Sequence, residues 1–389
     1  MNSSKKIEGE EDGMIEKFKD WYENRHEYAR NWKKETGGKV MGYFCTYVPE
    51  EILYAADVLP VRILGSHEPQ SVTEPYLFAM YCPFCRDCLA QGLEGKYDYL
   101  DGVMIAQSCI HIRQTYFTWE HHLPTEFNHY LSMPNNVHNK KAALPFLKKE
   151  YEVFIEGVEK WTGRKITDED LDRGIEIVNR DRQVMRDVYE TRKASQVPIS
   201  GLESMYMVVS SQLTHKEEHS RVVGDLLKDE LPGRTVGAED DIRLMTIGSE
   251  NDDVRFTEMV ESVGGNIVVD DHCTGTRYFW QDVEPQEDRL AAIAERYIDR
   301  TPCPTKDWMG RTRYEQIKYF VREFDVKGVI LIQQKFCDPH EISWPSLREV
   351  FEDMDVKTLT LEFDVTVPLG PFRIRVEAFL ETLGGDELF

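Results

Sequence analysis

Eight cysteines are the residues of this 389-residue chain whose type and placement most directly indicate chemistry. Four of them come directly after short apolar runs that predict β-strands, namely Cys45, Cys109, Cys273 and Cys337. In doubly wound folds, ligands bind in the crevice beyond the carboxyl ends of the strands. A single buried cysteine often serves only as a small apolar side chain. The four together instead indicate thiol ligands for a metal or redox centre at that crevice.

Two of these cysteines also precede sequences that predict the start of a helix. Pro49 lies shortly after Cys45, and Pro339 lies shortly after Cys337. Proline suits the first turn of a helix, where its missing N–H is not needed. A thiolate beside such a turn is favoured by the positive end of the helix dipole. The same dipole would offset the negative charge of a cysteine-ligated cluster.

A second group of cysteines forms a C-x2-C-x2-C run, Cys82-Pro-Phe-Cys85-Arg-Asp-Cys88. This spacing can open a ferredoxin-type cluster site or, with distant partners, a zinc site. However, residues 76–93 predict one amphipathic helix, and the fourth cysteine followed by proline that a ferredoxin run requires is missing. We therefore favour helix packing as the role of this run, with a metal site as the alternative.

Two other motifs are weaker. His215-Lys-Glu-Glu218-His219 matches the H-x-x-E-H arrangement of some zinc peptidases, but its surroundings are charged and no third ligand is evident. We interpret it as a solvated helix face. No segment has the spacing of a P-loop or of a dinucleotide-binding glycine fingerprint. If ATP is involved, we expect another chain to bind it.

The elements that would position these residues predict an α/β fold. Short runs rich in β-branched residues alternate with helical stretches, which is typical of parallel sheets covered by helices. The predicted strands are residues 40–44, 61–64, 103–106, 243–247, 267–269, 329–332 and 359–363. We expect two Rossmann-like lobes with parallel sheets and a helical insert, and a cluster between the lobes at the carboxyl ends of the strands.

The expected organisation has four parts. Residues 1–36 form an N-terminal tail and helix, 37–141 the first lobe, 142–235 a helical region, and 236–389 the second lobe. Within the helical region, residues 167–170 predict a capping box that opens a helix. The polar stretch 232–241 is the candidate linker between the helical region and the second lobe.

Composition narrows the classes of partner. The formal net charge is −23, and so acidic a surface disfavours nucleic acid and anionic membranes as partners. The longest apolar runs have the length of strands, which predicts no membrane span. Residues 1–13 lack the apolar core of a signal peptide, and we interpret them as a frayed tail on a cytoplasmic protein. In that compartment the cysteines are expected to be reduced.

Four long segments carry a resemblance to a known family. They are residues 42–56, 97–109, 328–339 and 372–379. In this order, they resemble motifs of the benzoyl-CoA reductase / 2-hydroxyacyl-CoA dehydratase family. The similarity extends over about residues 40–383, and long motifs agree at both ends of the chain.

The resemblance implies a cofactor and partners. It implies a [4Fe-4S] cluster held by Cys45, Cys109 and Cys337, with one iron left open, whereas Cys273 is not a ligand in this correspondence. It also implies a homologous second core subunit, ATP-hydrolysing iron–sulfur activator subunits that deliver electrons singly, and ferredoxin as the upstream donor. The substrate would be an acyl-CoA thioester.

Two chemistries compete within this family. One is the two-electron dearomatising reduction of benzoyl-CoA, or a substituted benzoyl-CoA, to a cyclohexadiene-carbonyl-CoA. The other is radical dehydration of a 2-hydroxyacyl-CoA. Residues 109–119 depart from the Asp-Gly-Lys-rich continuation of the dehydratases and look more like the C subunit of ATP-dependent benzoyl-CoA reductases. We therefore favour the reductase, with the dehydratase and a non-catalytic electron-relay subunit as alternatives.

Three further residues are candidates for roles at the site. Glu50 lies near the first cysteine and is a candidate catalytic residue, although capping of the following helix explains it too. His111 lies two residues after Cys109 and is a candidate proton donor or a hydrogen-bonding partner of the cluster. Arg277 is a candidate substrate ligand for the phosphates of coenzyme A, with a structural ion pair as the alternative.

Overall fold

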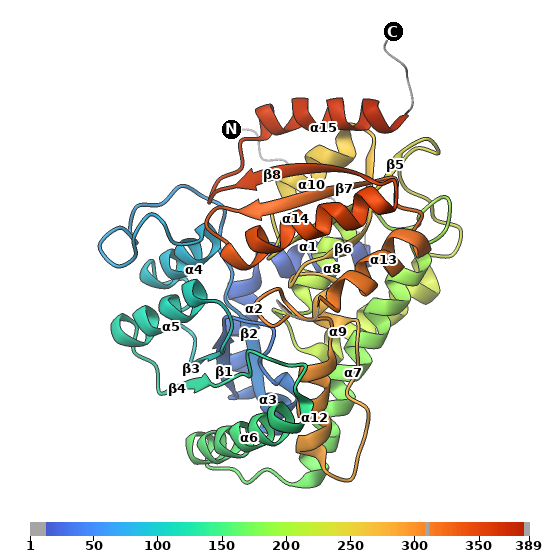
Figure 1. The fold of residues 1–389 in the computed structure, drawn as a ribbon. Helices are drawn as coiled ribbons and strands as arrows, with labels where there is room; N and C mark the ends of the chain where they lie inside the picture. The colour runs from blue at the N-terminus through green and yellow to red at the C-terminus, as the bar shows by residue number, and fades with distance from the viewer. Residues whose placement is uncertain (1–12, 308–310, 385–389) are drawn as a thin grey trace, which may run out of the picture.

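Two four-stranded parallel sheets organise the protein, whose computed structural model describes residues 13–307 and 311–384. The sheets occupy separate halves of the molecule (Figure 1), with helix α15 along the outer side of the second sheet and α6 below the first. This arrangement confirms the predicted α/β class with two Rossmann-like lobes. The N-terminal tail, residues 1–12, lies outside the described residues.

Both sheets have the same strand order relative to the chain. The first runs β2-β1-β3-β4, and the second runs β6-β5-β7-β8. In sequence order the strands are β1 Lys39–Tyr43, β2 Val58–Arg62, β3 Gly102–Ala106, β4 Phe127–Leu131, β5 Ile242–Gly248, β6 Gly265–Asp271, β7 Gly328–Gln334 and β8 Lys357–Phe363. Because all the strands in a sheet are parallel, their carboxyl ends meet along one edge.

Helices cover both sheets and fill the space between them. They are α1 Met14–Glu23, α2 Arg25–Thr36, α3 Glu50–Ala55, α4 Pro83–Leu93, α5 Ile110–His122, α6 Lys140–Thr162, α7 Asp168–Thr191, α8 Gly201–Ser210, α9 Lys216–Asp225, the π-helix η1 Leu226–Glu230, α10 Val254–Ser262, α11 Thr276–Phe279, α12 Arg289–Asp299, α13 Arg313–Glu323, α14 Asp338–Asp353 and α15 Leu369–Gly384.

Each of the seven predicted strands is present, with ends shifted by a few residues, and β4 is the strand that the sequence did not predict. In its sequence, Phe-Asn-His-Tyr-Leu, side chains alternate between the two faces of the strand, and each face carries a polar residue. Of the five residues only Leu131 is buried. β4 is an edge strand, so one side of it faces away from the sheet. A strand that buries so little apolar surface has a weak sequence signal.

The predicted helix over residues 76–93 is shorter than expected. The helix α4 begins at Pro83, with Cys82 as its N-cap, and residues 76–82 form turns. The residue before a proline is disfavoured in the helical conformation, which places the boundary here. This start brings Cys82 to the amino end of α4 rather than into a helix interior.

The helical region was predicted correctly in outline. Residues 140–230 hold α6, α7, α8, α9 and η1. The capping box is present, since the Thr167 hydroxyl accepts from the Asp170 N–H and the Asp170 carboxylate accepts from the Thr167 N–H. Helix α7 packs against α3, and α12 from the second half packs against α6. The exact division into four parts stays a prediction.

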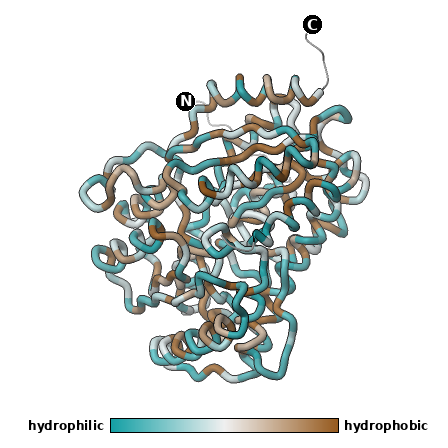
Figure 2. Tube along the Cα trace, in the orientation of Figure 1, coloured by the Kyte–Doolittle hydropathy of each residue, from teal (hydrophilic) through white to brown (hydrophobic). Residues whose placement is uncertain are grey.

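The core lies along the strands. Hydrophobic residues are concentrated there and hydrophilic ones along the outer loops (Figure 2), and β2, β3 and β7 are buried along their whole length. Within the described residues, no helix combines the length and the apolar character needed to cross a membrane.

Candidate functional site

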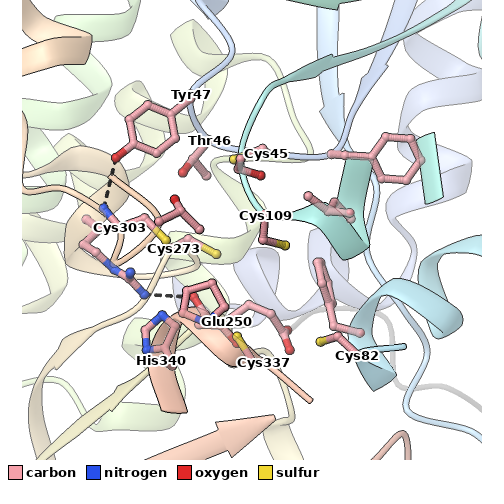
Figure 3. Close-up of a pocket in the computed structure, with 18 of the residues that line it drawn as sticks. Cys45, Thr46, Tyr47, Cys82, Cys109, Glu250, Cys273, Cys303, Cys337 and His340 are labelled. Atoms are coloured by element: carbon pink, nitrogen blue, oxygen red, sulfur yellow. Dashed lines mark hydrogen bonds between the residues drawn. The ribbon is translucent and has the colours of Figure 1, made fainter. Parts of the chain in front are cut away.

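Seven of the eight cysteines line one cavity between the two sheets. The cavity has a volume of about 90 Å³ and lies beyond the carboxyl ends of strands from both halves. The cysteines are Cys45, Cys82, Cys85, Cys109, Cys273, Cys303 and Cys337. Figure 3 shows side chains from both halves converging on this space. The four strand-end cysteines that the sequence singled out are thus brought together, as expected.

The local structure explains how three of them are presented. Cys109 is the N-cap of α5, and Cys337 is the N-cap of α14, whose first turn contains Pro339. Cys45 precedes α3, whose N-cap is Pro49. The two predicted helix starts are therefore confirmed. Cys109 and Cys337 lie at the positive ends of helix dipoles, which favour a thiolate.

The thiols of the cavity differ in acidity. A hydrogen bond from the Cys85 thiol lowers the pKa of Cys109 to about 7, and backbone N–H groups at the start of α5 reinforce this shift against the effect of burial. Burial raises the pKa of Cys45 and of Cys337. Cys109 is therefore the most readily ionised of the three thiols before any metal binds.

The C-x2-C-x2-C run divides between two roles. Cys82 and Cys85 line the cavity, whereas Cys88 lies in the core and its thiol donates to the Ile63 carbonyl at 3.6 Å. We favoured helix packing as the role of this run. That role fits Cys88, but it does not account for Cys82 and Cys85, which line the cavity. Because α4 starts at Pro83, Cys82 and Cys85 at its amino end face the cavity, whereas Cys88, further along the helix, is packed in the core.

Charged side chains complete the cavity. Arg62 donates to the Cys273 sulfur at 2.9 Å and to its carbonyl at 2.6 Å. Arg300 donates to the Thr46 carbonyl at 2.6 Å, and Arg277 donates to the Ser249 carbonyl at 2.9 Å. All three guanidiniums are buried. The cavity wall therefore carries several positive charges close to the thiols.

Several of these buried donors have no protein partner. They include Nη1 of Arg277 and Nε of Arg62 and of Arg300, and neither ring nitrogen of the buried His340 has a partner. A buried donor that makes no hydrogen bond is costly, so such donors indicate a missing acceptor. A thiolate-ligated iron–sulfur cluster carries negative charge and accepts hydrogen bonds at sulfur, and therefore fits this wall.

The size of the space agrees with a cluster rather than a lone ion. A single water needs only about 10–15 Å³ of such volume, so this cavity admits a larger group. Among the described residues, no three His, Cys, Asp or Glu side chains are close enough together to hold one metal ion. The cysteines of an iron–sulfur cluster bind different irons, so their sulfurs need not surround a single point.

The three other candidate residues have distinct surroundings. Glu50 is buried away from the cavity and accepts from the hydroxyls of Tyr43 at 3.1 Å and Tyr278 at 2.6 Å. His111 does not line the cavity, but its Nδ1 accepts from the Cys82 backbone N–H at 3.2 Å. This contact fixes the amino end of α4.

Arg277 lines the cavity and also forms an ion pair with the buried Asp271, Nε to Oδ1 at 3.3 Å. Arg277 therefore forms the structural ion pair that was the alternative prediction, and it also has a nitrogen, Nη1, without a hydrogen-bond partner. The roles predicted for Glu50, His111 and Arg277 stay predictions.

The side chains of His219 and Glu218 in the H-x-x-E-H motif bind other protein groups rather than being free to hold a zinc ion. Both ring nitrogens of His219 have partners, Asp181 at 2.6 Å and the Met207 carbonyl at 2.9 Å. Glu218 pairs with Lys17 at 3.0 Å. His219 is fully buried, so the motif is not wholly a solvated face as the sequence suggested.

Two kinds of cavity residue were missed from the sequence. Cys303 donates its backbone N–H to the Tyr47 hydroxyl at 3.0 Å and reaches the cavity from an irregular segment with no periodic pattern. Glu250 lies two residues after β5, and the strand-end argument that found the cysteines would have found it too.

A comparison with family models matches residues 45–383 to the 2-hydroxyglutaryl-CoA dehydratase, D-component. The chain belongs to this family. The match begins just after β1 and covers the other seven strands and the seven cysteines of the cavity. It confirms the resemblance drawn from the four sequence segments.

The relatives of this D-component family member bear two kinds of name. The chain is 30% identical over 377 residues to the (R)-phenyllactyl-CoA dehydratase beta subunit of Clostridium sporogenes, covering 96% of this chain and 99% of the relative. It is 26% identical to the beta subunit of the lactoyl-CoA dehydratase of Anaerotignum propionicum, with the same coverage. It is 24% identical over 364 residues to the C subunit of the benzoyl-CoA reductase of Thauera aromatica, covering 91% and 94%.

The names of these relatives have two features in common. Each denotes an enzyme whose name contains an acyl-CoA, and each denotes one subunit of that enzyme. They divide between dehydratase and reductase, so membership of the family leaves this choice open.

Proposed function

We propose that this chain is the iron–sulfur subunit of an enzyme that transfers single electrons to an acyl-CoA thioester. The observation that carries the proposal is the convergence of Cys45, Cys109 and Cys337 on one cavity beyond the carboxyl ends of β1, β3 and β7. They come from three loops that are far apart in the sequence. The resemblance implied the same three residues as ligands of a [4Fe-4S] cluster.

The surrounding residues have assignable tasks in this proposal. The three thiolates hold the group, and the amino ends of α5 and α14 stabilise their charge. Arg277 and Arg300, which also line the cavity, offset negative charge. Phe44, Phe84 and Ile112 also line the cavity and exclude water. A bound [4Fe-4S] cluster supplies one-electron transfer at low potential.

Partner chains are part of the proposal. The relatives are named as subunits, which supports a second, homologous core subunit. The sequence has no P-loop spacing, so ATP would be hydrolysed by separate iron–sulfur activator subunits that receive electrons from ferredoxin. Such an activator adds one electron at a time.

For the reaction, we propose reductive dearomatisation of benzoyl-CoA or a substituted benzoyl-CoA to a cyclohexadiene-carbonyl-CoA. Support comes from the segment after Cys109, residues 109–119, which looks like the reductase C subunit, and from the relative of that name. The aromatic residues of this segment do not form a ring pocket. Tyr116 and Trp119 are buried in the core, whereas Phe44, Tyr47 and Phe84 line the cavity.

Dehydration of a 2-hydroxyacyl-CoA is the second candidate. The specific observation in its favour is the 30% identity, over almost the whole length of both chains, to the (R)-phenyllactyl-CoA dehydratase beta subunit. Both reactions would begin at the thioester carbonyl, so the cavity serves either. The two differ in whether electrons are consumed.

An anaerobic assay of the reconstituted complex tests these alternatives. The chain is co-expressed with the second core subunit, and activator, ATP and a low-potential reductant are added. Benzoyl-CoA and (R)-phenyllactyl-CoA are then supplied separately. The reductase predicts conversion of benzoyl-CoA with continuing consumption of reductant. The dehydratase predicts conversion of phenyllactyl-CoA with only catalytic amounts of reductant. Conversion of neither, with the cluster present, would contradict both reactions.

A further inference from the structure

A buried carboxyl group, Glu250, faces the cysteine-lined cavity from the second half of the protein. It is 1% exposed and lies among the residues that line the cavity (Figure 3). Its Oε1 accepts a hydrogen bond from Gln334 Nε2 at 2.6 Å. The other oxygen, Oε2, receives no hydrogen from an N–H or hydroxyl donor. Glu250 is therefore held in place by one oxygen and available through the other.

Glu250 is linked to a second buried carboxyl group, Asp252. Asp252 is fully buried two residues further along the chain, and its side chain is near enough to Glu250 for the two to share a proton. Two carboxyl groups can share a hydrogen bond only if one of them carries a proton. The pair is thus a proton-holding unit directly beside the cavity.

Asp252 connects this unit to the surface through His67. The Nε2 of His67 lies 2.7 Å from Asp252 Oδ1, and the His67 side chain is 14% exposed to solvent. His67, Asp252 and Glu250 therefore stand in sequence from solvent to the cavity, with His67 and Asp252 in direct contact. Each member is a group that can both accept and release a proton.

The backbone at His67 is held in an unusual conformation. Its φ is +60°, in the left-handed region that residues other than glycine seldom adopt. Asp87 on α4 stabilises this turn, because its Oδ2 accepts from the N–H groups of Ser66 at 2.9 Å and of His67 at 2.8 Å. Such conformations persist where the surrounding structure enforces them, often at functional positions.

The charges around the three groups assign the protons. Burial and then the charge of Asp252 raise the pKa of Glu250 well above its usual range, and Cys273 and Cys82 act in the same direction while Arg62 opposes them. Burial disfavours the Asp252 carboxylate, but His67 and Arg25 outweigh this and lower its pKa. Glu250 therefore holds the proton of the pair.

For His67 itself, burial disfavours the imidazolium, but Asp252, together with Asp253 and Asp87, raises its pKa to about 9. The resting state is therefore a protonated Glu250, an Asp252 carboxylate and a His67 imidazolium. The pair and the histidine together are electrically neutral, which suits a buried site.

We propose that His67, Asp252 and Glu250 form a proton-transfer path from solvent into the cysteine-lined cavity, with Glu250 as its inner end. The use of the path in turnover rests on the proposed function. Glu250 would release its proton to an acceptor in the cavity and become a carboxylate. A proton then passes from His67 through Asp252 to Glu250, and His67 takes up a proton from water. The net transfer is one proton from solvent, and all three residues return to their starting states.

The path meets a need of the proposed chemistry. A two-electron reduction of a ring also adds two protons, and the apolar parts of the cavity wall exclude the water that would otherwise supply them. The electrons come from the activator subunits, and no electron passes through these three residues.

Infrared spectroscopy of the purified complex tests the path without substrate. A protonated carboxyl group gives a C=O stretch that shifts when its proton is replaced by deuterium. We expect a band that disappears in Glu250→Gln, a change that preserves the side-chain volume. After mixing into D₂O, this band should shift roughly tenfold or more slowly in His67→Gln than in the wild type, because glutamine cannot pass on a proton.

A matched control variant is His138→Gln. His138 forms a comparable pair with Asp307, Nε2 to Oδ1 at 3.0 Å, outside the path. Its exchange rate should equal that of the wild type. If His67→Gln fails to fold, His67→Asn provides the same test. An absent Glu250 band, or unchanged exchange in the His67 variant, would overturn the proposal.

The outcome is separable from that of the proposed function. Exchange of the Glu250 proton requires neither substrate nor electron transfer, so it reports on the path even if the reaction is assigned wrongly. A complex that turns over benzoyl-CoA or a 2-hydroxyacyl-CoA should also lose rate in His67→Gln at neutral pH, with partial rescue by added imidazole. Normal exchange in the wild type with no turnover of either substrate would contradict the function alone.

Discussion

The two halves of the protein share a strand order but differ in what they place at the cavity. Cys45 is the second residue after β1, and Glu250 is the second residue after β5, the strand at the same position in the other sheet. Cys109 is the third residue after β3, and Cys337 is the third residue after β7. Both of the latter cysteines are N-caps of the following helix.

The halves are therefore alike after β3 and β7, where each has a cysteine, and different after β1 and β5, where one has a cysteine and the other a glutamate. In the first half both positions carry a thiol, which suits holding a group. In the second half one carries a thiol and the other a carboxyl group whose pKa is raised by burial, with Arg277 and Arg300 also lining the cavity. We infer that the first half supplies most of the cluster ligands. The second half supplies most of the side chains that balance charge and transfer protons.

The largest expected effect concerns the buried charges of the second half. Asp271 is fully buried between Arg277 at 3.3 Å and Arg313 at 2.5 Å. Asp271→Asn would leave two buried guanidiniums without a counter-charge, and we expect it to lower the free energy of unfolding by roughly 3–5 kcal/mol. Denaturant unfolding without oxygen measures this change.

The control is an ion pair on the surface of the first half. Asp98 pairs with Arg30 at 2.6 Å, and both side chains are largely exposed. Asp98→Asn should change the unfolding free energy by less than about 1 kcal/mol. Equal effects of the two substitutions would show that Asp271 is not needed to balance the two buried guanidiniums.

A smaller effect should depend on pH. Because the pKa of His67 is about 9 in the folded protein and near 6.5 when unfolded, its pairing with Asp252 stabilises the protein fully below about pH 6.5. This contribution is lost as the pH rises through 9. We expect His67→Gln to destabilise the protein by roughly 2–3 kcal/mol at pH 6 and much less at pH 9.5.

Unfolding curves of the wild type and the His67 variant across this range provide the measurement. His138→Gln is again the control. A difference between wild type and His67→Gln that is constant with pH would show that the imidazolium is not formed in the folded state.

The smallest expected effect lies in the helical layer, outside both sheets. Thr167→Ala removes the capping hydroxyl of α7 and should cost about 1 kcal/mol. Thr167→Ser keeps the hydroxyl and should be close to wild type. Neither change should alter iron content, because α7 does not reach the cavity. Loss of iron in Thr167→Ala would mean that the site depends on this layer more than the contacts indicate.

Sequence reasoning located much of the fold and part of the site. Buried parallel strands produce compact apolar runs, so β3 and β7 could be recognised and the cysteines that follow them placed at one edge. The edge strand β4 buries one residue and was missed. The helix start at Pro83 was also missed, because the amphipathic pattern continues through the turns that precede it.

The rest of the cavity depends on contacts that periodicity does not encode. Cys303 comes from an irregular segment, and its position follows from packing near Tyr47. The path from His67 joins residues 185 positions apart in the chain. Glu250 was overlooked for a different reason, since acidic residues are so common in this chain that one more at a strand end was inconspicuous.

The most direct test of the central claim is the iron and acid-labile sulfide content of the anaerobically purified complex. Cys45, Cys109 and Cys337 are each changed to serine, and Cys88→Ser is the matched control because Cys88 lies in the core away from the cavity. We predict that each of the first three substitutions removes the iron and sulfide of this chain, whereas the control retains both. Full retention in the three variants, or loss only on changing Cys88, would contradict the assignment of the cavity as the cluster site.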